Sequence, residues 1–159
     1  MRENTGKVVL VGAGPGDTGL LTLKGEKYIK QADCLVYDRL SSPEFLSMAK
    51  AGCELIYVGK ENHKHVMNQD AINELLYEKS KYHELVVRLK GGDPYVFGRG
   101  GEEALYLVDR NVEVEVVPGV SSSVAALAAA GIPITHRGIA KGFQVITAHS
   151  RKDEEADID

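Results

Sequence analysis

Hydrophobic positions along the chain form two kinds of pattern, short apolar runs and longer amphipathic segments. The runs are rich in β-branched residues and end in glycine or a polar residue, which is typical of buried strands. Six runs predict strands at residues 7–12, 34–38, 53–59, 85–89, 112–117 and 143–148. Because helical segments separate most of these runs, the pattern predicts an α/β fold: a single domain with a mainly parallel sheet flanked by helices.

The amphipathic segments contain recognisable helix starts. The first helix should begin after Asp17 or Thr18, since either side chain can accept hydrogen bonds from the free N–H groups of a first turn. Another should begin at Asn68, with Asp70 in its first turn, where the helix dipole favours a negative charge. The other helices are predicted at residues 43–51, with Ser41 or Ser42 as cap, and at 101–110 and 121–130.

Unusual loops follow five of the predicted strands. The carboxyl ends of parallel strands lie along one edge of a sheet, and ligands bind beyond that edge. We therefore expect these loops to lie together and to form the functional site. They are Gly12–Gly19, Asp38–Arg39, Gly59–Lys60, Lys90–Gly101 and Pro118–Ser123.

Composition is that of an ordinary soluble domain. The 159 residues are 43% hydrophobic and 26% charged, which excludes disorder and coiled coil for the chain as a whole. No apolar run approaches the roughly 20 residues that span a bilayer, and the first residues lack the apolar stretch of a signal peptide. We expect a cytoplasmic protein that does not bind a membrane.

Charge is unevenly distributed. The formal net charge is -4, but five of the 23 acidic residues lie in Asp153–Asp159. We expect residues 1–150 to form the domain and residues 151–159 to form an acidic tail or the start of a linker. The rest of the chain is nearly neutral, so net charge does not indicate a nucleic-acid surface.

Cysteine and histidine do not indicate a metal. Cys34 and Cys53 lie in apolar runs, and buried free thiols in a reducing cytosol are the preferred interpretation, with a disulfide as the alternative. No pair of cysteines or histidines has the spacing of a zinc site. We expect no metal.

The first loop, Gly12-Ala13-Gly14-Pro15-Gly16-Asp17, is similar to a dinucleotide-binding fingerprint, and Asp38 stands where a ribose-binding acid would lie. The fingerprint fails because its third glycine would fall on Asp17. Pro15 also removes an N–H group that could bind a pyrophosphate. A plain glycine turn explains the loop as well, and nicotinamide or flavin binding is a less favoured alternative.

The stretch from Arg88 to Glu103 holds the most chemistry. Gly91 and Gly92 allow a ligand to approach the backbone closely, and Asp93 can accept hydrogen bonds from ligand hydroxyl or ammonium groups. Arg99 lies among glycines and can bind a carboxylate through two parallel hydrogen bonds. A surface loop with an Arg–Glu pair explains this arginine equally well.

Seven segments, in chain order, together resemble the tetrapyrrole methyltransferase family. The resemblance extends from residue 8 to about residue 149, and Arg88–Glu103 with Thr135-His136-Arg137 favours the branch that acts on uroporphyrinogen III. The segments are Val11–Asp17, Leu20–Gly25, Tyr37–Leu40, Val58–Lys60, Val87–Glu103, Val116–Val120 and Gly131–Arg137.

The resemblance implies S-adenosylmethionine as methyl donor and uroporphyrinogen III as acceptor. Two C-methylations would give precorrin-2, the branch point to sirohaem and cobalamin. It also implies a homodimer, and a second α/β domain that closes over the donor. The chain would then correspond to the N-terminal domain alone, and its own activity is an open question.

The resemblance also implies roles for individual residues. It implies acid–base roles for Asp38 and Lys60. Because the acceptor has eight carboxylates, its expected partners are cationic residues in the loops: Arg39, Arg99, His136 and Arg137. The implied donor-site residues are Pro15, Gly91, Gly92, Asp93, Val96, Ser121 and Ser122. The serines fit helix caps as well.

Three other functions stay open. One is the dinucleotide-dependent oxidoreductase considered above. Another is a related methylase that acts on a later corrin intermediate, an RNA or a protein. The third is a non-catalytic half-domain that assembles with a partner, which the presence of Asp38, Lys60 and Asp93 disfavours.

Overall fold

The computed structural model describes residues 5–39, 43–59 and 67–147. The chain divides into two units, one ending at Ser122 and the other beginning at Ser123. The predicted tail, residues 151–159, lies outside the described residues, as do Lys60 and the proposed caps Ser41 and Ser42.

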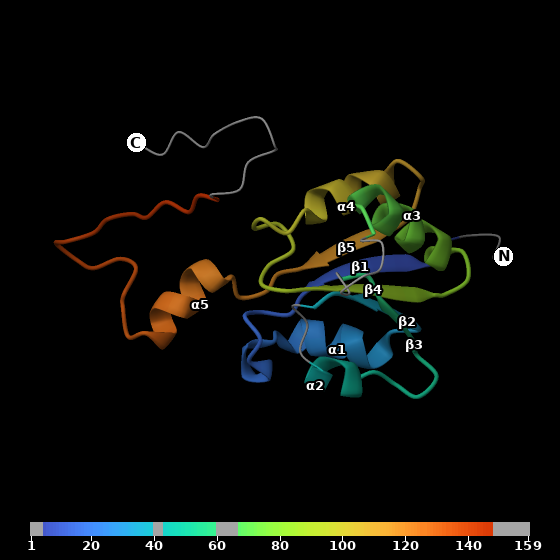
Figure 1. Ribbon diagram of the computed structural model, residues 1–159, viewed down its shortest axis with the longest axis horizontal. Coiled ribbons are helices and arrows are strands. Elements are labelled where there is room, and N and C mark those ends of the chain that lie inside the picture. The colour runs from blue at the N-terminus through green and yellow to red at the C-terminus, as the bar shows by residue number, and fades with distance from the viewer. Residues whose placement is uncertain (1–4, 40–42, 60–66, 148–159) are drawn as a thin grey trace. The chain divides into compact units, whose positions relative to one another are not determined.

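A five-stranded parallel sheet forms the centre of the first unit (Figure 1). Its order is β3-β2-β4-β1-β5. The strands are β1 (Lys7–Gly12), β2 (Cys34–Tyr37), β3 (Glu54–Tyr57), β4 (Leu85–Lys90) and β5 (Val114–Val117). Gly12 at the end of β1 lies opposite Lys90 at the end of β4, so the loops after these strands start side by side.

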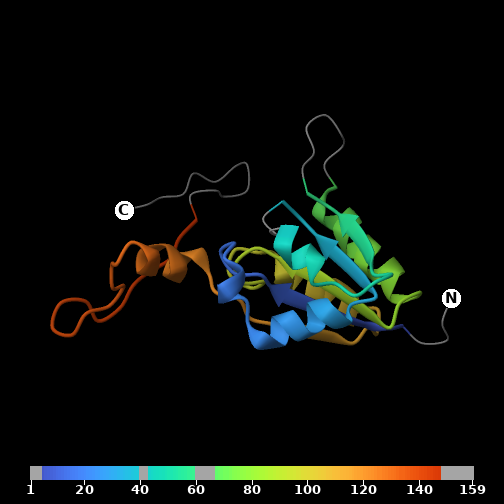
Figure 2. The same cartoon turned by 90° about the horizontal axis from the view of Figure 1, so that it is seen from below.

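Helices cover both faces of the sheet (Figures 1 and 2). On one face, Ile29 and Phe45 pack against the odd-numbered residues of β1, Val9 and Val11. These side chains come from α1 (Leu23–Gln31) and α2 (Pro43–Ser47). The other face is covered by α3 (Gln69–Ser80) and α4 (Gly100–Val108). Its core includes Val8, Leu10, Val36, Ile72, Leu76 and Leu107. The predicted α/β fold class is confirmed.

The start of the first helix differs from the prediction. Asp17 caps a separate 3-10 turn, Thr18–Leu20, by accepting a hydrogen bond from the Gly19 N–H at 2.8 Å. The α-helix begins only at Leu23, where the Thr22 hydroxyl is the cap. For α3 the prediction is confirmed, because Asn68 accepts a hydrogen bond from the Ala71 N–H at 2.8 Å.

The sixth predicted strand is wrong for residues 143–147, which are exposed and not in a strand. A strand requires a neighbour that satisfies its N–H and C=O groups, and these residues pair with no described strand. The last helix, α5 (Ser122–Ala129), begins at the boundary between the units.

Both cysteines are free thiols, as predicted, but only Cys34 is buried, whereas Cys53 is half-buried. Cys34 lies in the core beneath α3 and α4, whereas Cys53 packs on the side of α1 and α2, so the sheet separates them. Burial raises the pKa of Cys34 to about 12. Among the described residues, no helix has the length and apolar character needed to cross a bilayer.

Candidate functional site

Three glycine-containing loops meet at the carboxyl edge of the sheet. The N–H groups of Gly14 and Gly92 each donate to the carbonyl oxygen of the other, at 3.1 and 2.7 Å. The Gly119 N–H donates to Asp93 Oδ2 at 3.0 Å. The loops after β1, β4 and β5 therefore form one continuous surface, as the parallel sheet predicts.

Glycine is required where these loops cross. A Cβ atom at Gly119 would lie 2.2 Å from the carbonyl oxygen of Gly92, and one at Gly12 would lie 2.5 Å from the Gly119 nitrogen. Gly92 is different. It has a φ of +63°, and the nearest atom to an added Cβ would be Ser121 Cα, at 4.0 Å. The backbone of Gly92 thus borders open space in which a flat ligand can lie against it.

Asp93 organises this loop. Its Oδ1 accepts a hydrogen bond from the Tyr95 N–H at 2.8 Å, and its Oδ2 accepts the one from Gly119. An ionised carboxylate has about four acceptor positions. Asp93 can therefore hold two loops together and still accept a hydrogen bond from a ligand.

The other predicted donor-site residues lie on or beside the same loops. Pro15 is exposed directly after Gly14, and Ser121 is half-buried next to the space beside Gly92. Val96 is 42% exposed. Gly91 precedes Gly92, and Ser122 begins α5. The predicted residues therefore lie on the loops that follow β1, β4 and β5, whereas their contacts with a donor remain a prediction.

Asp38 follows β2 at the same edge. Arg88 Nη2 donates to its Oδ2 at 3.1 Å, and the Asp38 side chain is 24% exposed. The second predicted acid–base residue, Lys60, lies outside the described residues, and Arg39 is exposed in the turn after Asp38. Asp38 therefore combines a buried cationic partner with access to solvent.

Behind Asp38 lies a buried group of charges that the sequence analysis did not identify. Glu103 of α4 is fully buried, and its Oε1 accepts hydrogen bonds from Lys90 at 2.8 Å and Arg88 at 3.4 Å. Burial lowers the pKa of Lys90, and the neighbouring Arg88 cation lowers it further. The sequence does contain an indication of this group: Arg88 and Lys90 lie at alternate positions of an otherwise apolar strand. Charged side chains buried in such a strand require a buried partner of opposite charge.

The comparisons with known proteins identify the family of this chain. Residues 7–158 match the family described as Tetrapyrrole (Corrin/Porphyrin) Methylases. The chain is a tetrapyrrole methylase family member. It is 57% identical over 150 residues to a uroporphyrinogen-III C-methyltransferase of Methanocaldococcus jannaschii, covering 94% of this chain and 62% of that protein. It is 51% identical over 155 residues to siroheme synthase 2 of Yersinia enterocolitica, covering 98% of this chain and 33% of that protein.

A solved structure shares the family's fold with this chain. It is the uroporphyrin-III C-methyl transferase from Thermus thermophilus complexed with S-adenyl homocysteine, with 52% identity and a TM-score of 0.71. The match covers 86% of this chain and 53% of that one. The tetrapyrrole methylase chain thus spans between 33% and 62% of the length of these relatives.

Of the cations that the family resemblance assigns to substrate, Arg99 already has a partner. Its Nε and Nη2 donate to the two carboxylate oxygens of Glu102 at 2.8 and 2.7 Å, which raises the pKa of Arg99. His136 and Arg137 are exposed in the second unit, where the His136 N–H donates to the Ala140 carbonyl at 3.1 Å.

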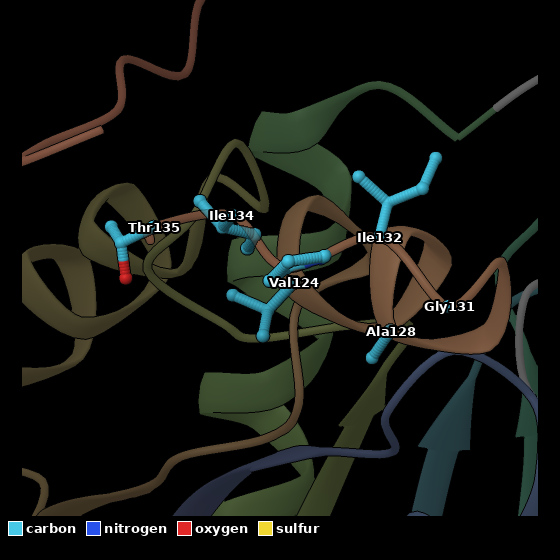
Figure 3. Close-up of a pocket in the computed structure, with 7 residues that line it drawn as sticks. Val124, Ala128, Gly131, Ile132, Ile134 and Thr135 are labelled. Carbon is cyan, nitrogen blue, oxygen red and sulfur yellow. The ribbon is translucent and has the colours of Figure 1, made fainter. Parts of the chain in front are cut away.

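The second unit of this tetrapyrrole methylase chain contains an apolar hollow of about 490 Å³ (Figure 3). None of the described residues that line it is charged, and the sequence analysis did not predict it. The lining residues are Val124, Ala128, Gly131, Ile132, Pro133, Ile134 and Thr135.

At the opposite edge of the sheet, Cys34, Glu54 and His83 have potential ligand atoms within 4.8 Å of one another. Sequence spacing did not indicate this group because the three residues come from separate elements. The Glu54 carboxylate accepts from Lys79 at 2.5 Å and contacts His83 at 2.8 Å, and chiefly the Lys79 hydrogen bond lowers its pKa. Protein groups thus already occupy both carboxylate oxygens, and we assign no ion there.

Proposed function

We propose that this chain is part of a methyltransferase that moves methyl groups from S-adenosylmethionine to two ring carbons of uroporphyrinogen III, giving precorrin-2 for sirohaem or cobalamin. Family membership and the names of the relatives support the reaction class and the acceptor. The S-adenyl homocysteine in the Thermus structure supports the donor.

The open space beside Gly92 is the observation that best supports a donor site in this chain. Neighbouring loops are packed so tightly that a Cβ would collide, yet at Gly92 the nearest atom to an added Cβ is 4.0 Å away. This space lies between Gly92 and Ser121, two of the residues proposed to bind the donor. We propose that Pro15, Gly91, Asp93, Val96 and Ser122 complete the donor site.

The proposed chemistry requires orientation and charge rather than a metal. S-adenosylmethionine supplies an electrophilic methyl group, and the acceptor carbon must be held in line with it. The acceptor gains positive charge as its carbon attacks. Asp38 would stabilise that charge or accept a proton, and Lys60 would return a proton or bind a substrate carboxylate.

Cationic side chains would bind the acceptor. We propose Arg39, Arg99, His136 and Arg137 as partners for its carboxylates, since an arginine guanidinium matches a carboxylate with two parallel hydrogen bonds. The two oxygens of Glu102, bound in this way by Arg99, occupy the positions that a substrate carboxylate would take.

The proposal extends to the whole protein. Residues 1–150 would be the N-terminal domain and residues 151–159 a linker or tail, with a second domain closing over the donor. The working form would be a cytoplasmic homodimer that binds neither nucleic acid nor membrane. The partial coverage of the relatives supports the second domain.

Calorimetry with S-adenosylhomocysteine tests this proposal. The titrations use this chain and this chain extended by the remaining C-terminal part of the Methanocaldococcus relative. We expect tighter binding by the extended protein, and methylation of uroporphyrinogen III only by that form. Absence of binding by the extended protein would reject the donor site, and binding without methylation would reject the acceptor.

A further inference from the structure

The buried charges behind Asp38 form a chain of alternating sign. In order they are Lys90, Glu103, Arg88 and Asp38, joined by contacts of 2.8, 3.4 and 3.1 Å. They come from β4, α4 and the end of β2, with Arg88 in the middle of the sheet. The first three side chains are at most 6% exposed, whereas Asp38 is 24% exposed. The chain of charges thus runs from the core to the surface of the site.

Arg88 is held from several directions. Its Nε donates to Glu103, and its Nη1 donates to the carbonyl oxygens of Leu89 at 2.9 Å and Val36 at 3.5 Å. The remaining group, Nη2, donates to Asp38. Because a guanidinium is planar and its donors are fixed in direction, these contacts determine where Nη2 points.

Glu103 is held in turn. Its Oε1 accepts from Lys90 and from Gln69 of α3 at 3.2 Å, and Gln69 also donates to Asn73 at 2.9 Å. Its Oε2 is buried and has no hydrogen-bond partner among the described residues. Such an incompletely satisfied buried carboxylate is costly, and core stability alone would favour an apolar side chain at this position.

We propose that Glu103 and Lys90 are positioning residues that hold Arg88 so that it fixes the carboxylate of Asp38 for the reaction. The inference rests on the role proposed for Asp38. Among the described residues, Arg99 at the start of α4 interacts electrostatically with Glu103 and with Asp70 at the start of α3. Both are nearer the surface than Glu103, and Arg99 is paired with Glu102.

A double-mutant cycle in the extended protein tests the proposal. Glu103→Gln should lower kcat at least about tenfold and change KM and donor affinity less than about threefold, the pattern for a lost transition-state interaction. In an Asp38→Asn background, Glu103→Gln should have no further effect, because its influence passes through Asp38. Equal effects in both backgrounds would overturn the proposal.

Matched variants separate positioning from folding. Glu54→Gln removes an ion-paired carboxylate at the opposite edge of the sheet and should leave kcat unchanged. The double variant Lys90→Met with Glu103→Gln removes one cation and one anion together and therefore keeps the net charge of the buried group. It serves as the test if Glu103→Gln alone does not fold. This double variant should show the same loss of kcat, and wild-type kcat in it would overturn the proposal.

A readout independent of activity distinguishes this inference from the proposed function. In ¹³C NMR of this chain at fixed neutral pH, Glu103→Gln should shift the Asp38 carboxyl signal, whereas Glu54→Gln should not. The separate Nη signals of a held Arg88 should merge in Glu103→Gln. An unmoved Asp38 signal would overturn the positioning role, whereas failure of the unaltered extended protein to methylate would overturn the proposed function only.

Discussion

At the scale of single residues, Gly92 matters both for the conformation of its loop and for the space available to a ligand. Its φ of +63° is a conformation in which L residues are strained, and its missing Cβ leaves space next to Ser121. We predict that Gly92→Ala lowers S-adenosylhomocysteine affinity in the extended protein at least about tenfold, or about 1.4 kcal/mol. Calorimetry measures this directly.

Gly52→Ala is the control for backbone strain. Gly52 has a φ of +80° and nothing within 4 Å of an added Cβ, but it lies in the turn before β3, at the other edge of the sheet. Both variants should lose about 1 kcal/mol of stability from the left-handed conformation, and only Gly92→Ala should lose affinity. Similar affinities in the two variants would remove Gly92 from the donor site.

Asp38→Asn tests the acid–base role. The substitution keeps the size of the side chain and an acceptor for Arg88, but it removes the negative charge. We predict a decrease in kcat of about a hundredfold or more, the scale of general acid–base catalysis, with little change in donor affinity. Steady-state kinetics of the extended protein provide the measurement. Normal turnover would leave Asp38 as a structural partner of Arg88.

The residues of the candidate site could be predicted where the local sequence alone indicates an unusual loop. The place of Gly91, Gly92 and Asp93 at the carboxyl edge of the sheet was predictable because they directly follow a predicted buried strand, whereas their role in binding stays a prediction. The partner of Asp38 was not predictable, because Arg88 lies 50 residues away and reaches Asp38 only through strand order. Asp93 also proved to bind backbone N–H groups of two loops, which sequence spacing does not reveal.

At the scale of elements, the crossing of three loops depends on Gly119. Its φ is not in the left-handed region, so only space forbids a side chain there. An added Cβ would lie 2.2 Å from the Gly92 carbonyl oxygen, and backbone cannot move aside as a side chain can. We predict that Gly119→Ala costs about 2 kcal/mol of stability, as overpacking does, and weakens donor binding.

Gly101→Ala provides the matched substitution. Gly101 lies in α4, and an added Cβ would meet nothing within 4 Å. Alanine favours helix over glycine by up to about 1 kcal/mol, so stability should stay the same or rise. Urea unfolding of both variants measures the change in stability, and calorimetry with S-adenosylhomocysteine measures the change in donor binding. Equal stability of the two variants would show that the loops can separate without cost.

Element predictions succeeded where a pattern was local and repeated. Five apolar runs became the five strands because each has a parallel neighbour in the sheet and contributes apolar side chains to the layers between the sheet and the helices. The run at 143–147 has the same composition but no described partner, and composition alone cannot supply one. Asp17 was a good cap, but for a 3-10 turn, since capping chemistry does not specify which kind of helix follows.

At the scale of the whole molecule, one topological fact determines where the candidate site lies. All strands are parallel, so every strand delivers its following loop to the same edge, and this was predictable from the alternation of strands and helices. The buried group of Lys90, Glu103 and Arg88 was not predictable from the sequence. Its prediction requires the knowledge that Glu103 of α4 lies next to the end of β4. The same knowledge of neighbours is needed to find ion pairs that stabilise the fold.

Glu115 of β5 forms such a group at the edge of the sheet. Its carboxylate contacts Lys24 and Tyr28 of α1 and Lys7 of β1, the last two at 2.6 Å. These hydrogen bonds, with Lys24 first, lower the pKa of Glu115 from 4.5 to about 2. A carboxyl whose pKa falls on folding stabilises the native state while ionised. Its contribution is therefore complete above pH 4.5 and is lost as the pH falls through about 2.

We predict that Glu115→Gln lowers the free energy of unfolding of this chain by about 1 kcal/mol at pH 7, since solvent screens the pairs and Lys24 is 59% exposed. The difference from wild type should shrink between pH 4 and pH 2. Glu113→Gln is the control, because Glu113 also contacts Lys7, at 3.0 Å, but is 72% exposed. It should change stability by less than about 0.5 kcal/mol. Urea unfolding at pH 7, 4 and 2 makes the comparison, and a difference for Glu115→Gln that does not vary with pH would mean that the ionised carboxylate is not what joins α1 to the sheet.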